Sequence, residues 1–191
     1  MGQGKKNAKR NRAWIVFTDE SGISQQPVVR RTWAPRGQTP VLVHDFNWKR
    51  ASVAVALGYR WDGKQTRLWF QTKTGTYDTT SLIAFIRQIG RHRRRRPTIL
   101  IWDGLPAHKS RVMMDFIASQ SSWLTVERLP GYSPELNPTE AVFGNVKGNE
   151  LANRCSTDLA DATSALRTGL GRVRRSRTLV KSFLKHSGLS F

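Results

Sequence analysis

Two acidic residues stand where a divalent metal ion could be held. Asp19 follows the apolar run Trp-Ile-Val-Phe-Thr, and Asp103 follows Thr-Ile-Leu-Ile-Trp, so each is predicted at the end of a short buried strand. If these strands are neighbours, the two carboxylates meet at the rim of the core and repel each other, and a divalent cation relieves that repulsion. Carboxylate ligands without a Cys or His cluster favour Mg²⁺ or Mn²⁺ over zinc.

The acids of interest also have purely structural interpretations. Asp19 alone could begin a turn, and Asp103-Gly104 is a strong hairpin signal, although the following Leu-Pro-Ala-His-Lys-Ser does not resume a strand. A further acid, Glu140, fits the third position of a helix whose N-cap is Asn137, a capping box that needs no catalysis. Taken one at a time, none of the three acids establishes a site.

The elements around these acids alternate in period from strand to helix. Two-residue alternation and β-branched content predict strands, and apolar residues at i, i+3, i+4 and i+7 predict helices. Thr79 or Thr80 would cap a helix that closes at Gly90, and Asp62-Gly63 predicts a hairpin turn. The first predicted elements are strands, and strands then alternate with helices. This order favours an α/β fold with a mixed sheet flanked by helices. The predicted strands cover residues 14–18, 28–33, 51–59, 67–72, 98–102 and 123–129, and the predicted helices cover 79–90, 109–119 and 138–151, with basic helices after them.

Composition indicates one basic domain that binds a polyanion. The 191 residues contain 32 Lys and Arg against 13 Asp and Glu, a formal charge of +19, which points to nucleic acid before any anionic membrane. The single Cys155 allows no intramolecular disulfide. Residues 1–12 form a basic segment without apolar periodicity, expected to be a disordered arm until it meets phosphate. The apolar stretch 13–17 is too short for a signal sequence or membrane span, so we expect a cytoplasmic protein without a membrane partner.

Three separated blocks carry a resemblance to a known family. The phrase Gly-Tyr-Ser-Pro-Glu-Leu-Asn-Pro-Thr-Glu at 131–140, followed by Phe143 and Lys147, resembles the segment around the third acid of IS630-group transposases, relatives of Tc1/mariner. The segment 30–40, Arg-Arg-Thr-Trp-Ala-Pro-Arg-Gly-Gln-Thr-Pro, is similar to the one after their first acid, and 101–109 is similar to the block of the second. Residues 104–139 separate the second acid from the third, and the blocks together span 14–151.

The resemblance implies a DDE-type transposase catalytic domain with an RNase H-like fold, spanning residues 13–191. Asp19, Asp103 and Glu140 would be the catalytic and metal-binding acids of a two-metal phosphoryl transfer, using Mg²⁺ or Mn²⁺ to cleave DNA and join the freed 3′ end during transposition of an insertion sequence. His108 would orient water or touch the scissile phosphate, although a surface His capping a helix explains it about as well. Glu20 should face the other side of its strand and is left out of the ligand set.

Two departures from the family pattern bear on partners. Gly104 stands where the family often has Asn, and only the basic segment 1–12 precedes the first acid's strand, where relatives usually carry a helix-turn-helix region. The chain therefore resembles a catalytic half served by a separately encoded DNA-binding half. We also expect a homodimer on DNA, because a transposase holds two DNA ends, in a bacterial protein that joins the nucleoid when bound to DNA.

The DNA contacts are assigned to basic side chains and one aromatic ring. Five of the six residues 91–96 are Arg, and Arg172, Arg174, Arg175 and Arg177 form a second basic cluster. Arg of this kind holds phosphate without reading sequence, although such runs are often solvated faces and Trp33 could equally be core. The residues expected to contact DNA are Arg31, Trp33, Arg36, Arg93, Arg94, Arg95, Lys109 and Lys147.

Two other functions remain compatible with the sequence. A non-catalytic DNA-binding relic of a transposase would keep the fold and charge without the chemistry. Another RNase H-like nuclease, such as a junction resolvase, would cleave branched DNA without strand transfer. The second alternative leaves the phrase at 133–140 unexplained.

Overall fold

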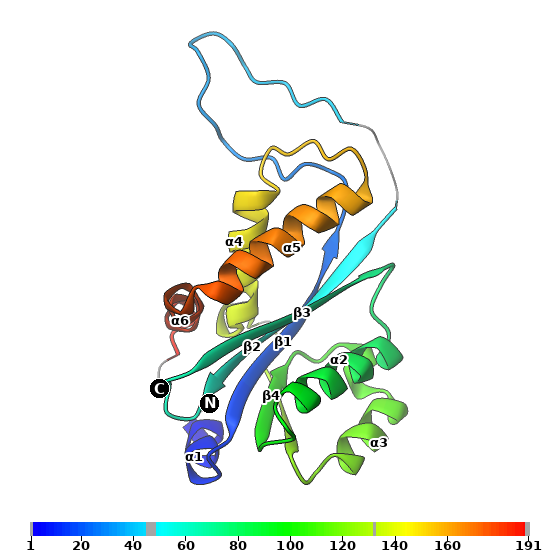
Figure 1. The fold of residues 1–191 in the computed structure, drawn as a ribbon, viewed down its shortest axis with the longest axis vertical. Coiled ribbons are helices and arrows are strands. Elements are labelled where there is room, and N and C mark those ends of the chain that lie inside the picture. Colours follow the sequence, from blue (N-terminus) through cyan, green and yellow to red (C-terminus); the bar gives the residue numbers. More distant parts are fainter. Residues whose placement is uncertain (1, 45–48, 132, 190–191) are drawn as a thin grey trace.

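A five-stranded mixed sheet forms the centre of the molecule (Figure 1). The computed structural model describes residues 2–44, 49–131 and 133–189; Tyr132, part of the third sequence block, lies outside them. The strand order is β3-β2-β1-β4-β5, in which β2 is antiparallel to both β1 and β3, whereas β4 is parallel to both β1 and β5. The strands are β1 (Trp14–Ile23), β2 (Ala51–Arg60), β3 (Thr66–Thr74), β4 (Thr98–Trp102) and β5 (Leu124–Arg128).

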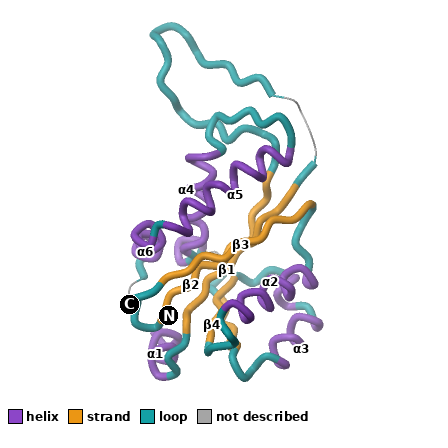
Figure 2. Tube along the Cα trace, viewed as in Figure 1, coloured by secondary structure: helices purple, strands orange, loops and turns teal. Residues whose placement is uncertain are grey.

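Helices cover both faces of this sheet (Figures 1 and 2). One face carries α4 (Pro138–Glu150), α5 (Leu159–Arg175) and α6 (Arg177–His186). The other face carries α2 (Thr79–His92) and α3 (Arg111–Ser119). Short 3₁₀ turns, η1 (Pro106–Lys109) and η2 (Pro134–Leu136), precede α3 and α4. The expected mixed sheet flanked by helices is confirmed.

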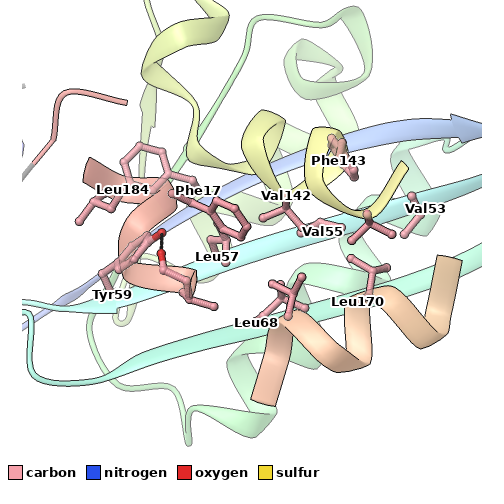
Figure 3. Packing of buried hydrophobic residues seen from close by; sticks show 14 of the residues in the cluster. Phe17, Val53, Val55, Leu57, Tyr59, Leu68, Val142, Phe143, Leu170 and Leu184 are labelled. Carbon is pink, nitrogen blue, oxygen red and sulfur yellow. Dashed lines mark hydrogen bonds between the residues drawn. The ribbon is translucent and has the colours of Figure 1, made fainter. Parts of the chain in front are cut away.

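Two apolar cores follow from the alternation of side chains along the strands. Ile15, Phe17, Val53 and Val55 point toward α4, α5 and α6, whereas Val16 and residues of the opposite parity pack beneath α2 and α3. Figure 3 shows the first core, where Tyr59 also donates a hydrogen bond from Oη to the carbonyl oxygen of Val180 at 3.0 Å. A sheet buried on both faces explains why β2 is apolar or small along nearly its whole length.

The predicted elements around the acids are largely confirmed, with shifted ends. β4 matches residues 98–102, and the Asp62-Gly63 turn closes the β2–β3 hairpin with Gly63 at a φ of 65°. The side chain of Asp78, and not of Thr79 or Thr80, caps α2 by accepting from the amide of Ser81 at 2.7 Å. Strand β1 continues past Thr18 to Ile23 because β2 keeps pairing with it.

The predicted strand at 28–33 was wrong. Only Val28 forms a bridge, to Ala152, and residues 29–44 have no regular secondary structure. This segment leaves β1 and extends away from the body (Figure 1), so no neighbouring strand is present to pair with its apolar residues.

The N-terminal segment also differs from the expected disordered arm. Gly2–Arg10 forms a helix, α1, and Ala8 is buried in the core on the α4–α6 side. The amide of Ala13 donates to the carbonyl of Ala8 at 2.9 Å, which ties the end of the helix to the start of β1. Ala8 gives no signal in the sequence because the residues around it are mostly basic or polar.

Candidate active site

Asp19 lies in the middle of the sheet, on the same face as α4. It is paired with Val55 across β1 and β2, and its side chain follows Phe17 in the alternation along β1. Its Oδ1 accepts the amide of Glu20 at 2.8 Å, and its Oδ2 accepts Nδ2 of Asn137 at 3.1 Å. The carboxylate is therefore held at both oxygens, and the interpretation of Asp19 as a turn residue is excluded.

Asp103 leaves the end of β4, the strand parallel to β1. Its Oδ1 accepts the amide of Leu105 at 3.2 Å and lies 2.8 Å from Nδ1 of His108. The chain continues into η1 and α3, and Gly104 does not have the positive φ that a type I′ hairpin turn needs. The hairpin interpretation of Asp103-Gly104 is therefore excluded.

His108 is a buried bridge between two acids. Its ring stacks on Trp102 with centroids 4.1 Å apart, and its Nε2 lies 3.5 Å from Oε2 of Glu20, while Nδ1 faces Asp103. Burial disfavours the imidazolium, but Glu20 and Asp103 outweigh it and hold the pKa of His108 above its ordinary value. His108, only 1% exposed, is thus a support for Asp103, and the interpretation as a surface cap is excluded.

Glu20 is a member of this group that sequence reasoning left out. It does face away from Asp19, as the strand alternation predicts, but that face carries His108. The contact joins residues 88 positions apart on different elements, and no local pattern indicates it. Glu20, on the sheet face opposite to Asp19, is therefore connected to Asp103 through His108.

Glu140 projects from the first turn of α4 with an exposed side chain. The amide of Asn137 donates to the carbonyl of Pro134 at 2.9 Å, so it does not receive the Glu140 side chain as a capping box requires. Oδ1 of Asn137 caps the helix through the amide of Thr139 at 3.2 Å. Glu140 is thus free of a capping duty, and it lines a cavity of about 460 Å³ together with Asn137 and residues of α6.

The three acids interact electrostatically. Burial, with the negative charges of Glu140, Glu20 and Asp103, raises the pKa of Asp19 to about 7, although the amide of Glu20 acts in the opposite direction. Among residues 2–44, 49–131 and 133–189, no three acidic, His or Cys side chains are gathered closely enough to form a ready-made ion site. The donor set of hard carboxylate oxygens and the cost of ionising Asp19 both fit a divalent cation such as Mg²⁺ or Mn²⁺.

Most of the expected DNA contacts lie on the surface. Arg31, Trp33 and Arg36 are exposed on the segment after β1, and Trp33, at 99% exposed, is not a core residue. Lys109 is exposed beside Gly104, where an added Cβ would lie 3.2 Å from its Nζ. Lys147 donates from Nζ to Oγ of Ser21 at 2.7 Å, two residues beyond Asp19.

Arg93 corrects the assignment of the arginine run to DNA. Its guanidinium lies 3.9 Å from the ring centroid of Trp14, and the residue is only 7% exposed. Burial, with the positive charges of Arg96 and Arg67, lowers the pKa of Arg93 to about 10. Arg94 and Arg95, both exposed and at φ near 50°, remain at the surface. Tertiary packing therefore divides one basic run into a structural residue and two surface residues.

Comparison with known proteins identifies the family. A family model described as "DDE superfamily endonuclease" matches residues 14–161, which include all three acids. The chain belongs to the DDE superfamily of endonucleases. The matched domain is therefore of the DDE endonuclease class. No curated protein sequence matches the chain.

Solved structures show the same fold. The mariner Mos1 paired-end complex with Mg is similar at a TM-score of 0.64 and 19% identity, over 98% of this chain and 58% of that one. The Mos1 strand transfer complex has a TM-score of 0.60 and 20% identity, over 100% of this chain and 60% of that one. The pre-cleavage Mos1 transpososome has a TM-score of 0.60 and 18% identity, over 100% of this chain and 61% of that one. The expected RNase H-like fold is confirmed, and this chain spans about three fifths of those Mos1 chains.

None of the helices in the part of the chain that the structure describes is both long and apolar enough to cross a membrane.

Proposed function

We propose that this chain is the catalytic half of a bacterial IS630-group transposase that cleaves DNA at an element's end and joins the freed 3′ end to target DNA. One observation carries the proposal: the three acids of the family blocks stand on β1, at the end of β4 and at the start of α4, and burial, with the negative charges of Glu140, Glu20 and Asp103, raises the pKa of Asp19 to about 7. The Mos1 structures of the same fold include a paired-end complex with a transposon end and a strand transfer complex, which supports the two reactions.

Asp19, Asp103 and Glu140 would hold two Mg²⁺ or Mn²⁺ ions. When bound, these ions activate the attacking oxygen and stabilise the leaving one. In the first reaction a water oxygen bonds to phosphorus while the bond to the 3′ oxygen breaks, and that oxygen leaves as a 3′-hydroxyl with a proton from the water. In the second, the oxygen of that 3′-hydroxyl bonds to a target phosphorus while the bond from this phosphorus to the target strand's own 3′ oxygen breaks, and the target oxygen leaves as a 3′-hydroxyl. The Mos1 complexes with Mg and with Mn support this choice of ions.

The surrounding residues would orient the acids. His108 holds Asp103 through Nδ1 at 2.8 Å, and the side-chain Nδ2 of Asn137 donates to Oδ2 of Asp19 at 3.1 Å. Lys109 and Lys147 would contact the backbone on either side of the acids, and Arg31, Trp33, Arg36, Arg94 and Arg95 would contact DNA farther out. Base reading would belong to a separately encoded helix-turn-helix half, and two copies of the chain would hold two DNA ends, at the nucleoid of the cell.

Metal-dependent nicking of a supercoiled plasmid tests the proposal. Wild type is compared with Asp103→Asn and Glu140→Gln in Mg²⁺, Mn²⁺ and EDTA, with strand transfer of a labelled 3′ end scored in the same samples. We expect nicking and joining by wild type with either metal, none in EDTA, and at least about a hundredfold loss in each variant, since each removes a metal-binding carboxylate.

Asp115→Asn is the matched control, because Asp115 on α3 is exposed and does not line the cavity that Glu140 lines. It should cut like wild type. All variants should bind DNA in EDTA. Tight DNA binding by wild type without cutting in any metal would instead identify a DNA-binding relic, and cleavage of branched DNA without joining would identify a resolvase-like nuclease.

A further inference from the structure

A basic groove lies between the edge strand β3 and helix α5, apart from the acids. It has a volume of about 810 Å³ and is lined by the last residues of β3, the first residue of β2 and one face of α5. Arg174 and Arg175, from the second basic cluster of the sequence, line it, but the DNA contacts proposed above do not include them. The face of α5 that lines it comprises Leu159, Ala160, Thr163, Ser164, Arg167, Thr168, Gly171, Arg174 and Arg175.

The lining chemistry suits a phosphodiester backbone. Three arginines and five hydroxyl side chains line the groove, and none of its lining residues is acidic. Arg167, Arg174 and Arg175 are exposed, and within the described ranges no carboxylate lies at ion-pair distance from any of them. Guanidinium and hydroxyl groups donate hydrogen bonds to phosphate oxygens. The lining hydroxyls come from Thr72, Thr74, Thr163, Ser164 and Thr168.

Lys73 is the one lining cation already engaged elsewhere. Its Nζ donates to Oγ of Ser81 at 2.6 Å and lies 3.6 Å from Oδ2 of Asp78, on the α2 side. The guanidinium of Arg174 in contrast lies 5.4 Å from the ring centroid of Phe70, whose ring supports it at the groove. The positive charge of the groove therefore comes from α5.

The dimensions match a short stretch of DNA strand. Arg167 and Arg175 are eight residues apart, which at the rise of an α-helix is about 12 Å. Each strand of a duplex presents one phosphate per about 3.4 Å of axis, so this length faces about three phosphates. The groove also opens on the face that carries Asp19, because Ser21 pairs with Val53 and Val53 with Thr72. Two strand spacings, about 10 Å, separate Thr72 from Ser21.

Gly171 borders the groove at a position where packing leaves room for a side chain. A Cβ added there would meet only Nη1 of Arg175, at 3.6 Å, so packing does not require a glycine. A Cβ at Gly169, on another side of α5, would lie 2.5 Å from Oε2 of Glu150. The two glycines thus have different roles, and only Gly171 borders the groove.

We propose that this groove binds the backbone of a DNA duplex, as a second phosphate-binding site beside the acidic one. The inference rests on the proposed function in one respect, that DNA is the substrate. It would hold the duplex across β3 while a phosphate lies at the acids.

The test compares Arg167→Gln/Arg174→Gln/Arg175→Gln with a control of equal charge loss on α6, Arg177→Gln/Lys181→Gln/Lys185→Gln. Binding of a fluorescent duplex is measured by anisotropy in EDTA over a range of NaCl. Each lost phosphate contact should reduce the slope of log K against log[salt] by about 0.9, so we expect a reduction of roughly 2 to 3 for the groove variant and less than half of that for the control. Equal reductions in the two variants overturn the proposal.

A second pair of variants separates contact from folding. Gly171→Glu places a negative charge in the groove, and Gly171→Gln places the same volume without charge. Both should show the far-UV circular dichroism of wild type, and only Gly171→Glu should weaken binding by tenfold or more. Equal affinities in the two variants overturn the proposal.

Proximity is read directly by cross-linking. In a Cys155→Ser background, a photoreactive maleimide is attached to Ser164→Cys in the groove or to Ser182→Cys on α6. A labelled duplex should cross-link at position 164 and not at 182, and the reverse overturns the proposal.

Nicking measured with the same proteins distinguishes a failure of the groove proposal from a failure of the proposed function. If wild type nicks DNA and the groove variants bind like the α6 control, the groove inference fails and the proposed function stands. If the groove variants lose binding as expected while Asp103→Asn still nicks like wild type, the proposed function fails and the groove stands.

Discussion

Asp19 bears the largest electrostatic cost among the residues of the site. Its carboxylate is largely withdrawn from water and interacts with the negative charges of Glu140, Glu20 and Asp103, and its pKa of about 7 means that ionising it in the metal-free protein opposes folding. For an acid whose folded pKa is raised, the favourable contribution is present below the unfolded value of 3.8 and is lost as pH rises through about 7. The metal-free protein should therefore lose stability between these values.

Asp19→Asn should remove this loss. In EDTA at pH 8 we expect the variant to be more stable than wild type by at least about 1.4 kcal/mol, the free energy of one pKa unit, which corresponds to a rise in Tm of about 3 °C or more. The difference should shrink toward pH 5, where Asp19 is protonated. Thermal melts over this pH range measure it, with the exposed Asp115→Asn on α3 as control; a difference that does not depend on pH contradicts the prediction.

His108 and Glu20 act on the site through Asp103. Because Oε2 of Glu20 lies 3.5 Å from Nε2 of His108, its charge helps to hold the imidazolium whose Nδ1 supports Asp103. Groups that orient a metal ligand from behind commonly change metal affinity or activity by about 10- to 100-fold.

Glu20→Gln should therefore reduce metal-dependent nicking by about tenfold or more and shift its metal dependence to higher Mg²⁺, while DNA binding in EDTA stays unchanged. Titration of nicking against Mg²⁺ measures both effects. Glu127→Gln on β5 removes the same charge away from His108 and should behave like wild type. An unchanged metal midpoint in Glu20→Gln would show that the contact is only structural.

At the scale of elements, the packing of α4 on α5 positions Glu140. Gly169 permits this close approach, since a Cβ there would lie 2.5 Å from Oε2 of Glu150 and 2.7 Å from Cγ1 of Val146. Glu150 is itself fixed by Arg172, whose Nε donates to Oε1 at 2.7 Å. The helix that carries Glu140 thus depends on a glycine about three turns into the neighbouring helix α5.

Gly169→Ala should destabilise the protein by about 1–3 kcal/mol, the usual cost of overpacking. Gly171→Ala, in the same helix with open space around it, should be neutral or stabilising by up to about 1 kcal/mol through helix propensity. Urea denaturation of both variants measures the difference. Equal free energies of unfolding in the two variants would show that α4 and α5 accommodate a Cβ at position 169 without loss of stability.

At the scale of the whole molecule, a charge of +19 makes DNA binding strongly dependent on salt. The contribution of each arginine depends on where the fold places it. Arg94 and Arg95 are exposed, whereas Arg93 is buried against Trp14.

Arg94→Gln/Arg95→Gln should reduce the salt slope of duplex binding by up to about 1.8, at 0.9 per phosphate contact. Arg93→Gln should leave the slope unchanged and lower the Tm instead, because it removes the guanidinium that covers Trp14. Anisotropy titrations and thermal melts separate the two effects. A reduced salt slope in Arg93→Gln at unchanged Tm would show that Arg93 contacts DNA.

Sequence by itself determined the features that depend on neighbours along the chain. The acids at the ends of apolar runs, the strand and helix periods, and the three family blocks all depend on short segments, so they predicted the mixed sheet, the DDE endonuclease family and the order of the acids. Strand alternation even placed Glu20 on the correct face.

Tertiary structure alone decided which residues far apart in the chain meet. It brought Glu20 to His108, placed Arg93 beneath the surface, anchored α1 through Ala8, and left residues 29–44 without a partner strand. It also turned the amide of Asn137 toward Pro134 and so freed Glu140. The physical reason is that burial and electrostatic coupling depend on distances in space, which the packing of helices on the sheet sets and local sequence patterns do not encode.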